Sequence, residues 1–188
     1  MRKCSADVNH IRLHGAVGEA PVYSHLNHGV EFYTFPLVVR RLSGAEDQVN
    51  VVAPLELLEC CGPLERESEL TVLGEVRTFN NRTGVGSRLV ISAFARELRQ
   101  EPGEDENRLE LSGTLCKTPS LRATPLGRTI CDMILAVNRR YGRADYLPCI
   151  AWGSLAHRCG GMEVGDQLRL TGRLQSRTYT KVSGDRSE

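Results

Sequence analysis

The feature that most constrains the fold of this chain is an internal duplication. When the 188-residue sequence is shifted by 98 positions, its two halves align without an insertion. NHIRLHGAVGEAP (9–21) falls on NRLELSGTLCKTP (107–119), and ELTVLGEV (69–76) falls on QLRLTGRL (167–174). Chance similarity rarely keeps one register through glycines, turns and apolar positions together. The sequence therefore predicts two copies of one structural unit.

Each copy alternates apolar and polar residues in the manner of β-strands. The first copy has five such segments, with a helix-compatible stretch (54–65) between the third and the fourth. The second copy repeats four strands and the helical stretch (153–163), and it ends at KVSGDRSE before a fifth strand. Five short strands with one helix between the third and fourth is the order of an OB-fold barrel. We predict an all-β chain of two tandem five-stranded OB folds, the second completed by further chain or by a partner.

The two copies differ in charge. We place the first barrel in residues 1–98, an acidic linker containing glycine and proline in 99–106, and the second barrel in 107–188. The first holds ten Lys and Arg against twelve Asp and Glu, and the second holds thirteen against seven, giving net charges of −2 and +6. A polyanion is therefore expected to bind the second copy.

Four motifs of the second copy occur in the order and spacing of one known family: NRLELSGTL, TPSLRATPLGRTICDMILAVNRRY, ADYLPCIAWGSLA and VGDQLRLTGRLQSRTY. This copy resembles the bacterial single-stranded DNA-binding protein family. The resemblance implies binding of single-stranded DNA with little sequence specificity in replication, recombination or repair. Some members carry two OB folds per chain, so it also implies a homodimer with four OB folds. The first copy matches through the duplication and is similar to primosomal replication protein N.

Base-stacking rings are expected on the second copy. Alternation along its third strand directs Leu147, Cys149 and Ala151 to the core and the residues between them to the other face. The resemblance places stacking aromatics at four positions, which hold all of this copy's aromatic residues: Tyr141, Tyr146, Trp152 and Tyr179. An interface role for Trp152 with Ile150 is the alternative.

The first copy lacks these rings. Its equivalent positions are Ser43, Gln48, Pro54 and Asn81. Its own aromatics occupy other positions, largely in strands where they could pack in the core: Tyr23, Phe32, Tyr33, Phe35, Phe79 and Phe94. The first copy is therefore predicted to be an assembly or docking unit.

Basic residues flank the predicted rings. Tyr141 lies among Arg139, Arg140 and Arg143, and Tyr179 lies between Arg177 and Lys181. Arg122 lies in the first hairpin, at a position that is also basic in the family. A single arginine is commonly a solvated surface charge. Cations interleaved with aromatic residues favour a groove that follows a nucleic-acid backbone.

Other functions find little support in the sequence. There is no G-x-x-x-x-G-K-[ST], H-E-x-x-H or G-x-S-x-G motif, so we expect neither an enzyme nor a metal or cofactor site. The sequence shows neither a signal-peptide pattern nor an apolar run of membrane length, so a cytoplasmic, nucleoid-associated protein is expected. The alternative function is a protein-interaction paralogue of replication, plasmid or phage machinery that binds nucleic acid weakly. RNA also stays open as a ligand, because stacking does not report the 2′-hydroxyl.

Overall fold

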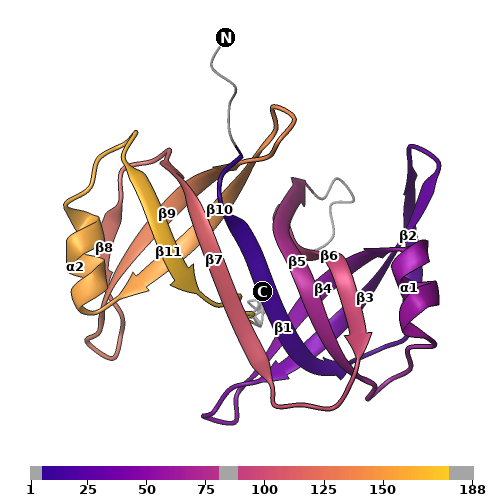
Figure 1. Cartoon of the computed structure of the whole chain (residues 1–188). Coiled ribbons are helices and arrows are strands. Elements are labelled where there is room, and N and C mark those ends of the chain that lie inside the picture. Colours follow the sequence, from indigo (N-terminus) through magenta and orange to yellow (C-terminus); the bar gives the residue numbers. More distant parts are fainter. Residues whose placement is uncertain (1–5, 81–88, 178–188) are drawn as a thin grey trace, which may run out of the picture.

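The computed structural model describes residues 6–80 and 89–177, which form strands and two short helices (Figure 1). The elements of the first copy are β1 (Asn9–Val17), β2 (Val22–Asn27), β3 (Val30–Arg40), β4 (Glu46–Pro54), α1 (Leu55–Cys61), β5 (Glu69–Asn80) and β6 (Leu89–Gln100). Those of the second are β7 (Glu106–Leu115), β8 (Ser120–Ala123), β9 (Thr129–Asn138), β10 (Ala144–Trp152), α2 (Ser154–Gly160) and β11 (Gln167–Gly172). Neither helix in this part of the chain is long and apolar enough to cross a membrane.

The first copy forms a closed barrel. β1 pairs with both β3 and β5, β5 pairs with β6, β6 runs parallel to β4, and β4 pairs with β3. With α1 between the third and fourth barrel strands, this is the predicted OB fold. Leu13, Phe35 and Val72 point inward from three of these strands and are almost completely buried. The short strand β2, which the sequence pattern did not separate, extends β3 into a hairpin.

The second copy repeats this arrangement with four barrel strands. β11 pairs with β7, β7 with β9, and β9 with β10. Among residues 89–177 no fifth strand joins β10 to β11, and the rest of this copy lies outside the described residues. The burial of equivalent residues follows this difference. Leu70 and Val72 of β5 are fully buried, whereas Leu168 and Leu170 of β11 remain partly exposed.

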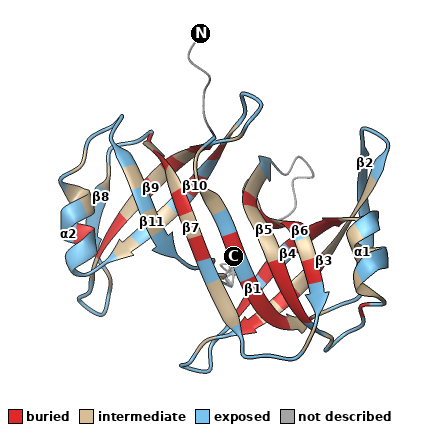
Figure 2. Ribbon diagram, in the orientation of Figure 1, coloured by how far each residue is buried: buried red, intermediate tan, exposed pale blue. Residues whose placement is uncertain are grey.

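The two barrels are joined by one antiparallel strand pair, β1 with β7, which produces a continuous 11-stranded sheet (Figures 1 and 2). Ile11 faces Leu109, its own counterpart in the duplication, and both are buried. On either side, the pairing of Asn9 with Leu111 mirrors that of Leu13 with Asn107. The copies are therefore related by a pseudo-twofold axis through the Ile11–Leu109 pair, as in the interface of a symmetric dimer.

Two equivalent ion-pair clamps hold the copies together on either side of this axis. In one clamp, buried Asp145 binds the guanidinium of Arg139 through two hydrogen bonds of 2.7 and 2.6 Å. The same carboxylate accepts hydrogen bonds from the backbone N–H and hydroxyl of Thr78, which lies in β5 of the other copy. In the second clamp, Asp47 binds Arg41 and accepts the backbone N–H of Ser176 at 3.1 Å. Thr78 and Ser176 are themselves equivalent residues.

Both clamp carboxylates are held in the charged form. Hydrogen bonds from Arg41 lower the pKa of Asp47, against an opposing effect of burial, and the Ser176 N–H lowers it further. Burial alone would raise the pKa of Asp145, but the hydrogen bonds from Arg139 and Thr78 outweigh burial and lower it. Each clamp therefore contributes stability only while its carboxylate is ionised.

Glycine is required where the first strand of each barrel passes close to the second. A Cβ added at Gly113 of β7 would lie 2.5 Å from the carbonyl oxygen of Ala136 and 2.8 Å from Cγ of Leu135. Gly15 of β1 makes the same close approach to Val38. These two glycines occupy equivalent positions in the duplication. The close approach explains why both copies have glycine there.

Replacing Gly113 with alanine is expected to destabilise the chain by about 2 kcal/mol, because the backbone of β9 has to move away from the new methyl group. Urea denaturation measures the change. Gly172→Ala in β11 is the matched control, since no atom lies within 4 Å of its added Cβ. Equal midpoints for the two variants would contradict this account of the close approach.

The Asp145 clamp gives a pH-dependent prediction. Asp145→Asn is expected to lower the free energy of unfolding by about 3 kcal/mol at pH 7, because it removes the charge that neutralises Arg139. The wild-type Asp145 carboxylate becomes protonated as pH falls through its lowered pKa. The difference in free energy of unfolding between the two proteins therefore narrows below about pH 4. Asp132→Asn, which removes an exposed partner of Arg122, is expected to cost less than about 1 kcal/mol. A difference that persists unchanged at pH 2 would rule out the clamp as its source.

Candidate nucleic-acid interface

The aromatic residues of β10 lie on its outer face. Burial alternates along this strand: Leu147 is buried, whereas Tyr146, Ile150 and Trp152 are exposed, with fractions of 55%, 37% and 41%. The Cys149 thiol faces inward, and burial raises its pKa to about 11, so it is neutral at physiological pH. The predicted alternation is thus present, and it leaves two aromatic rings and one aliphatic side chain on the same surface.

The strand register brings Arg122 to this surface. Trp152 of β10 pairs with Ile130 of β9, which in turn pairs with Arg122 of β8. Residues in register across neighbouring strands share a face and are spaced by about 4.8 Å per strand. A ring and a cation therefore lie in one row, on either side of Ile130.

The loop between β9 and β10 presents Tyr141 to solvent. The N–H of Arg139 bonds the carbonyl of Arg143 at 2.7 Å, and Gly142 provides the positive φ that the tight turn requires. Tyr141 is 94% exposed at the tip. A ring this exposed is not part of the core, so the packing of the barrel does not explain its position.

This loop borders a groove of about 980 Å³ between the two copies. Arg139, Arg140, Tyr141 and Arg143 line it from the second copy. The first copy contributes Glu75, Arg77 and Arg96 from β5 and β6, together with the turn of the β2–β3 hairpin. The loop rises above the junction of the barrels, on the side of β5 (Figure 1). The groove thus carries more positive than negative side chains.

The predicted arginines differ in how they are engaged. Arg139 forms the clamp with Asp145, and Arg122 is paired with Asp132 at 2.5 Å on the exposed surface. Arg140 and Arg143 are exposed, and within the described ranges neither forms an ion pair. These two guanidinium groups are therefore the most available for a ligand, while Arg139 holds the loop in place.

Of the last three predicted residues, only Arg177 lies in the part of the chain that the structure describes. Ser176 is bound to Asp47 and to the N–H of Gln48, so Arg177 lies beside the β3–β4 hairpin of the first copy. It is exposed there. Tyr179 and Lys181 lie outside the described residues, and their predicted roles stay predictions.

The core location that the sequence allowed for the aromatics of the first copy is wrong for all but one of them. Only Phe35 is buried, whereas Tyr23 and Phe79 are more than half exposed and Phe32, Tyr33 and Phe94 are partly exposed. Their strands place most of them on the outer face of the barrel or on the β2–β3 hairpin. The error came from comparing the copies position by position. In the row that holds Trp152, Ile130 and Arg122, the first copy has Pro54, Phe32 and His25. In this row the second copy carries its ring on β10, as Trp152, and the first copy carries its ring on β3, as Phe32.

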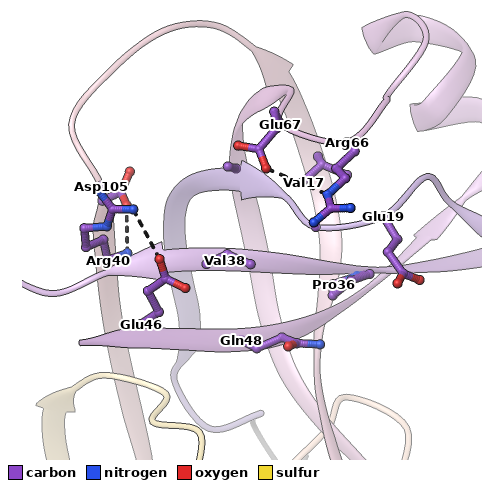
Figure 3. Close-up of a pocket in the computed structure, with 12 residues that line it drawn as sticks. Val17, Glu19, Pro36, Val38, Arg40, Glu46, Gln48, Arg66, Glu67 and Asp105 are labelled. Carbon is purple, nitrogen blue, oxygen red and sulfur yellow. Dashed lines mark hydrogen bonds and ion pairs between the residues drawn. The ribbon is translucent and has the colours of Figure 1, made fainter. Parts of the chain in front are cut away.

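A second hollow of about 370 Å³ lies on the first copy, and its charge is acidic (Figure 3). Four carboxylates line it beside two arginines: Glu19, Glu46, Glu67, Asp105, Arg40 and Arg66. Both arginines are already paired, Arg40 with Glu46 at 3.2 Å and Arg66 with Glu67 at 3.9 Å. The arrangement repels phosphate and is not a candidate for a polyanion.

No cluster of three or more metal-ligating side chains is present in residues 6–80 and 89–177. His25, from the HLNH segment, stacks on Phe32 with ring centroids 4.9 Å apart and hydrogen bonds Ser24. Its imidazole is thus engaged with the hairpin itself.

The fold and this interface define a tandem OB-fold protein with an aromatic and basic surface on one copy. Residues 106–188 match the model of the Single-strand binding protein family, which confirms the resemblance predicted for the second copy. The single-stranded DNA-binding protein of Clostridium tetani is 36% identical over 87 residues, covering 43% of this chain and 60% of that protein. Single-stranded DNA-binding protein A of Bacillus subtilis is also 36% identical over 87 residues, covering 43% and 51%. The matched segment thus spans about half to three fifths of these relatives.

A solved structure extends the likeness to both copies. The single-stranded DNA binding protein from Thermus aquaticus superposes with a TM-score of 0.77 at 22% identity, covering 97% of this chain and 100% of that one. This likeness shows the fold. The similarity of the first copy to primosomal replication protein N stays a prediction.

Proposed function

We propose that this chain binds single-stranded DNA with little sequence preference, and that residues 107–188 are its main binding unit. The observation that carries the proposal is the outer face of β10, where Tyr146 and Trp152 are exposed in a copy with a net charge of +6. Exposed rings stack on bases of any sequence, contributing about 1–3 kcal/mol per base. Arg140 and Arg143 supply cations for the phosphates beside Tyr141. The match of residues 106–188 to the Single-strand binding protein family supports the same ligand.

The wider setting is also a proposal. A binding role without catalysis, in replication, recombination or repair, fits relatives that are named single-stranded DNA-binding proteins in bacteria. We place the protein in the cytoplasm on nucleoid DNA, as a homodimer that brings four OB folds together and recruits replication or repair proteins. We place the other unit in residues 1–98 and the linker in 99–106, although β6 continues to Gln100 and β7 begins at Glu106. Light scattering after gel filtration measures the oligomeric state directly.

Binding is tested with Trp152, the only tryptophan of the chain. Titration with oligo-dT is expected to quench its fluorescence, and the affinity is expected to fall as salt rises because phosphate contacts release counterions. Trp152→Ala and Tyr141→Ala should each weaken binding by about tenfold, followed by anisotropy of a labelled oligonucleotide.

The duplication supplies controls for these variants. Ser43→Ala and Gln48→Ala change the first-copy equivalents of Tyr141 and Tyr146 and are expected to bind like wild type. Unchanged fluorescence together with no salt-sensitive binding would refute the proposal and favour a protein-interaction role. Competition with matched RNA oligomers decides whether the 2′-hydroxyl matters.

A further inference from the structure

The two ends of the molecule are formed by equivalent parts of the two copies. The β2–β3 hairpin lies beside α1 at one end, and the β8–β9 hairpin lies beside α2 at the opposite end (Figure 1). A shift of 98 positions carries residues 20–37 and 54–62 onto residues 118–135 and 152–160. We call the first two ranges the α1 end and the last two the α2 end.

The two ends carry opposite charges. The α1 end contains three glutamates and no lysine or arginine, so its net charge is −3. The α2 end contains three arginines against one aspartate, so its net charge is +2. These residues are Glu31, Glu56 and Glu59 at the α1 end, and Arg122, Arg128, Arg158 and Asp132 at the α2 end. Four of them are exposed and form no ion pair within residues 6–80 and 89–177: Glu56, Glu59, Arg128 and Arg158.

The negative charges of the α1 end lie on one surface. Partial burial, followed by the charge and the hydrogen bond of Glu31, raises the pKa of Tyr33, and the charge of Glu59 raises it further. Glu31 belongs to the hairpin and Glu59 to the helix, so carboxylates of both elements lie near the same hydroxyl group. This surface repels phosphate, so nucleic acid is not its ligand.

Both ends also expose large apolar side chains. All six residues of β2 are exposed. Three apolar side chains at each end are between 46% and 87% exposed: Val22, Tyr23 and Leu26 at the α1 end, and Leu121, Leu126 and Leu155 at the α2 end. Exposed apolar side chains gathered beside charged ones are typical of a surface that binds another protein.

We propose that the α1 end of one molecule binds the α2 end of a second copy of this chain. The opposite charges orient the two molecules, and the apolar side chains of both ends are removed from water in the contact. The ends lie on opposite sides of the β1–β7 junction, so a chain does not make this contact with itself (Figure 1). Each contact joins two different surfaces and leaves one free end of each kind, so further copies add in a row. The inference goes beyond the proposed DNA binding and does not depend on it.

The test begins with sedimentation velocity of the wild-type chain over a range of protein concentrations. In about 0.05 M salt the average mass is expected to rise beyond that of a dimer as the protein is concentrated, and in about 0.5 M salt this rise is lost because the charges are screened. A closed homodimer would instead keep one mass at concentrations above its dissociation constant. A wild-type chain that never exceeds the dimer in low salt would overturn the inference.

Charge reversal at one end gives the sharper comparison. Glu56→Arg with Glu59→Arg changes the α1 end from −3 to +1, and Arg128→Glu with Arg158→Glu changes the α2 end from +2 to −2, because each substitution shifts the charge by two. Each double variant alone is expected to lose the low-salt association, since its ends no longer attract. An equimolar mixture of the two variants is expected to regain it, because the +1 end meets the −2 end and the unchanged ends meet each other.

Glu19→Arg with Glu104→Arg is the matched control. It makes the same change in total charge at two exposed glutamates outside the α1 end, and it is expected to associate like wild type. Equal losses in this control and in the α1-end variant, or a mixture that stays unassociated, would overturn the inference and leave the two ends as surfaces for other proteins. Failure of the wild-type chain to bind oligo-dT is a separate result, which would overturn the proposed function and not this contact.

Discussion

The pairing of β1 with β7 is the contact on which the rest of this structure depends. It places a self-equivalent pair, Ile11 and Leu109, at the centre of the molecule and so fixes the pseudo-twofold relation of the barrels. Once that relation is set, the end of β5 has to reach the start of β10, and the segment after β11 has to reach the start of β4. The two aspartate clamps occur at these crossings. The groove beside the Tyr141 loop lies next to one of them, where the hydrogen bonds from Thr78 to Asp145 join the two copies.

The arginines of this region fall into two groups, those bound by a buried carboxylate and those exposed to solvent. Arg139 and Arg41 are bound by buried carboxylates, and their charge is used to hold a loop and to join the copies. Arg140 and Arg143 extend from the same loop into solvent. A chain that binds a polyanion needs both kinds, because an unrestrained loop would lose conformational entropy each time the ligand ordered it. The clamp orders the loop in advance, and the guanidinium groups of Arg140 and Arg143 remain exposed to solvent.

The sequence predicted the architecture because the duplication repeats four of the five barrel strands in one register. Alternation also correctly assigned Leu147 to the core and Tyr146 to the surface of β10. The sequence did not predict the partners of Arg139 and Arg122, since neither the burial of Asp145 nor the pairing of β8 with β9 can be read from spacing alone. The strand pattern also wrongly suggested core positions for Phe32 and Phe94, which are partly exposed. Their positions in the chain are those of ordinary core strands, and their exposure follows from which strands lie beside them in the barrel. Comparison across a row of strands, rather than along the chain, is the signal that would have found them.

The presence of both halves in one chain affects the orientation in which a polymer with distinct ends would be held. A receptor with true twofold symmetry offers the same surface in two opposite orientations, so it holds a polymer with distinct ends equally well either way round. Here the twofold relation is approximate: one half carries its ring on β10 and the other on β3, and their net charges differ in sign. A single strand in contact with both halves would therefore be held with one 5′-to-3′ polarity relative to the protein. The duplication has thus produced a pseudo-symmetric molecule whose two halves offer different surfaces.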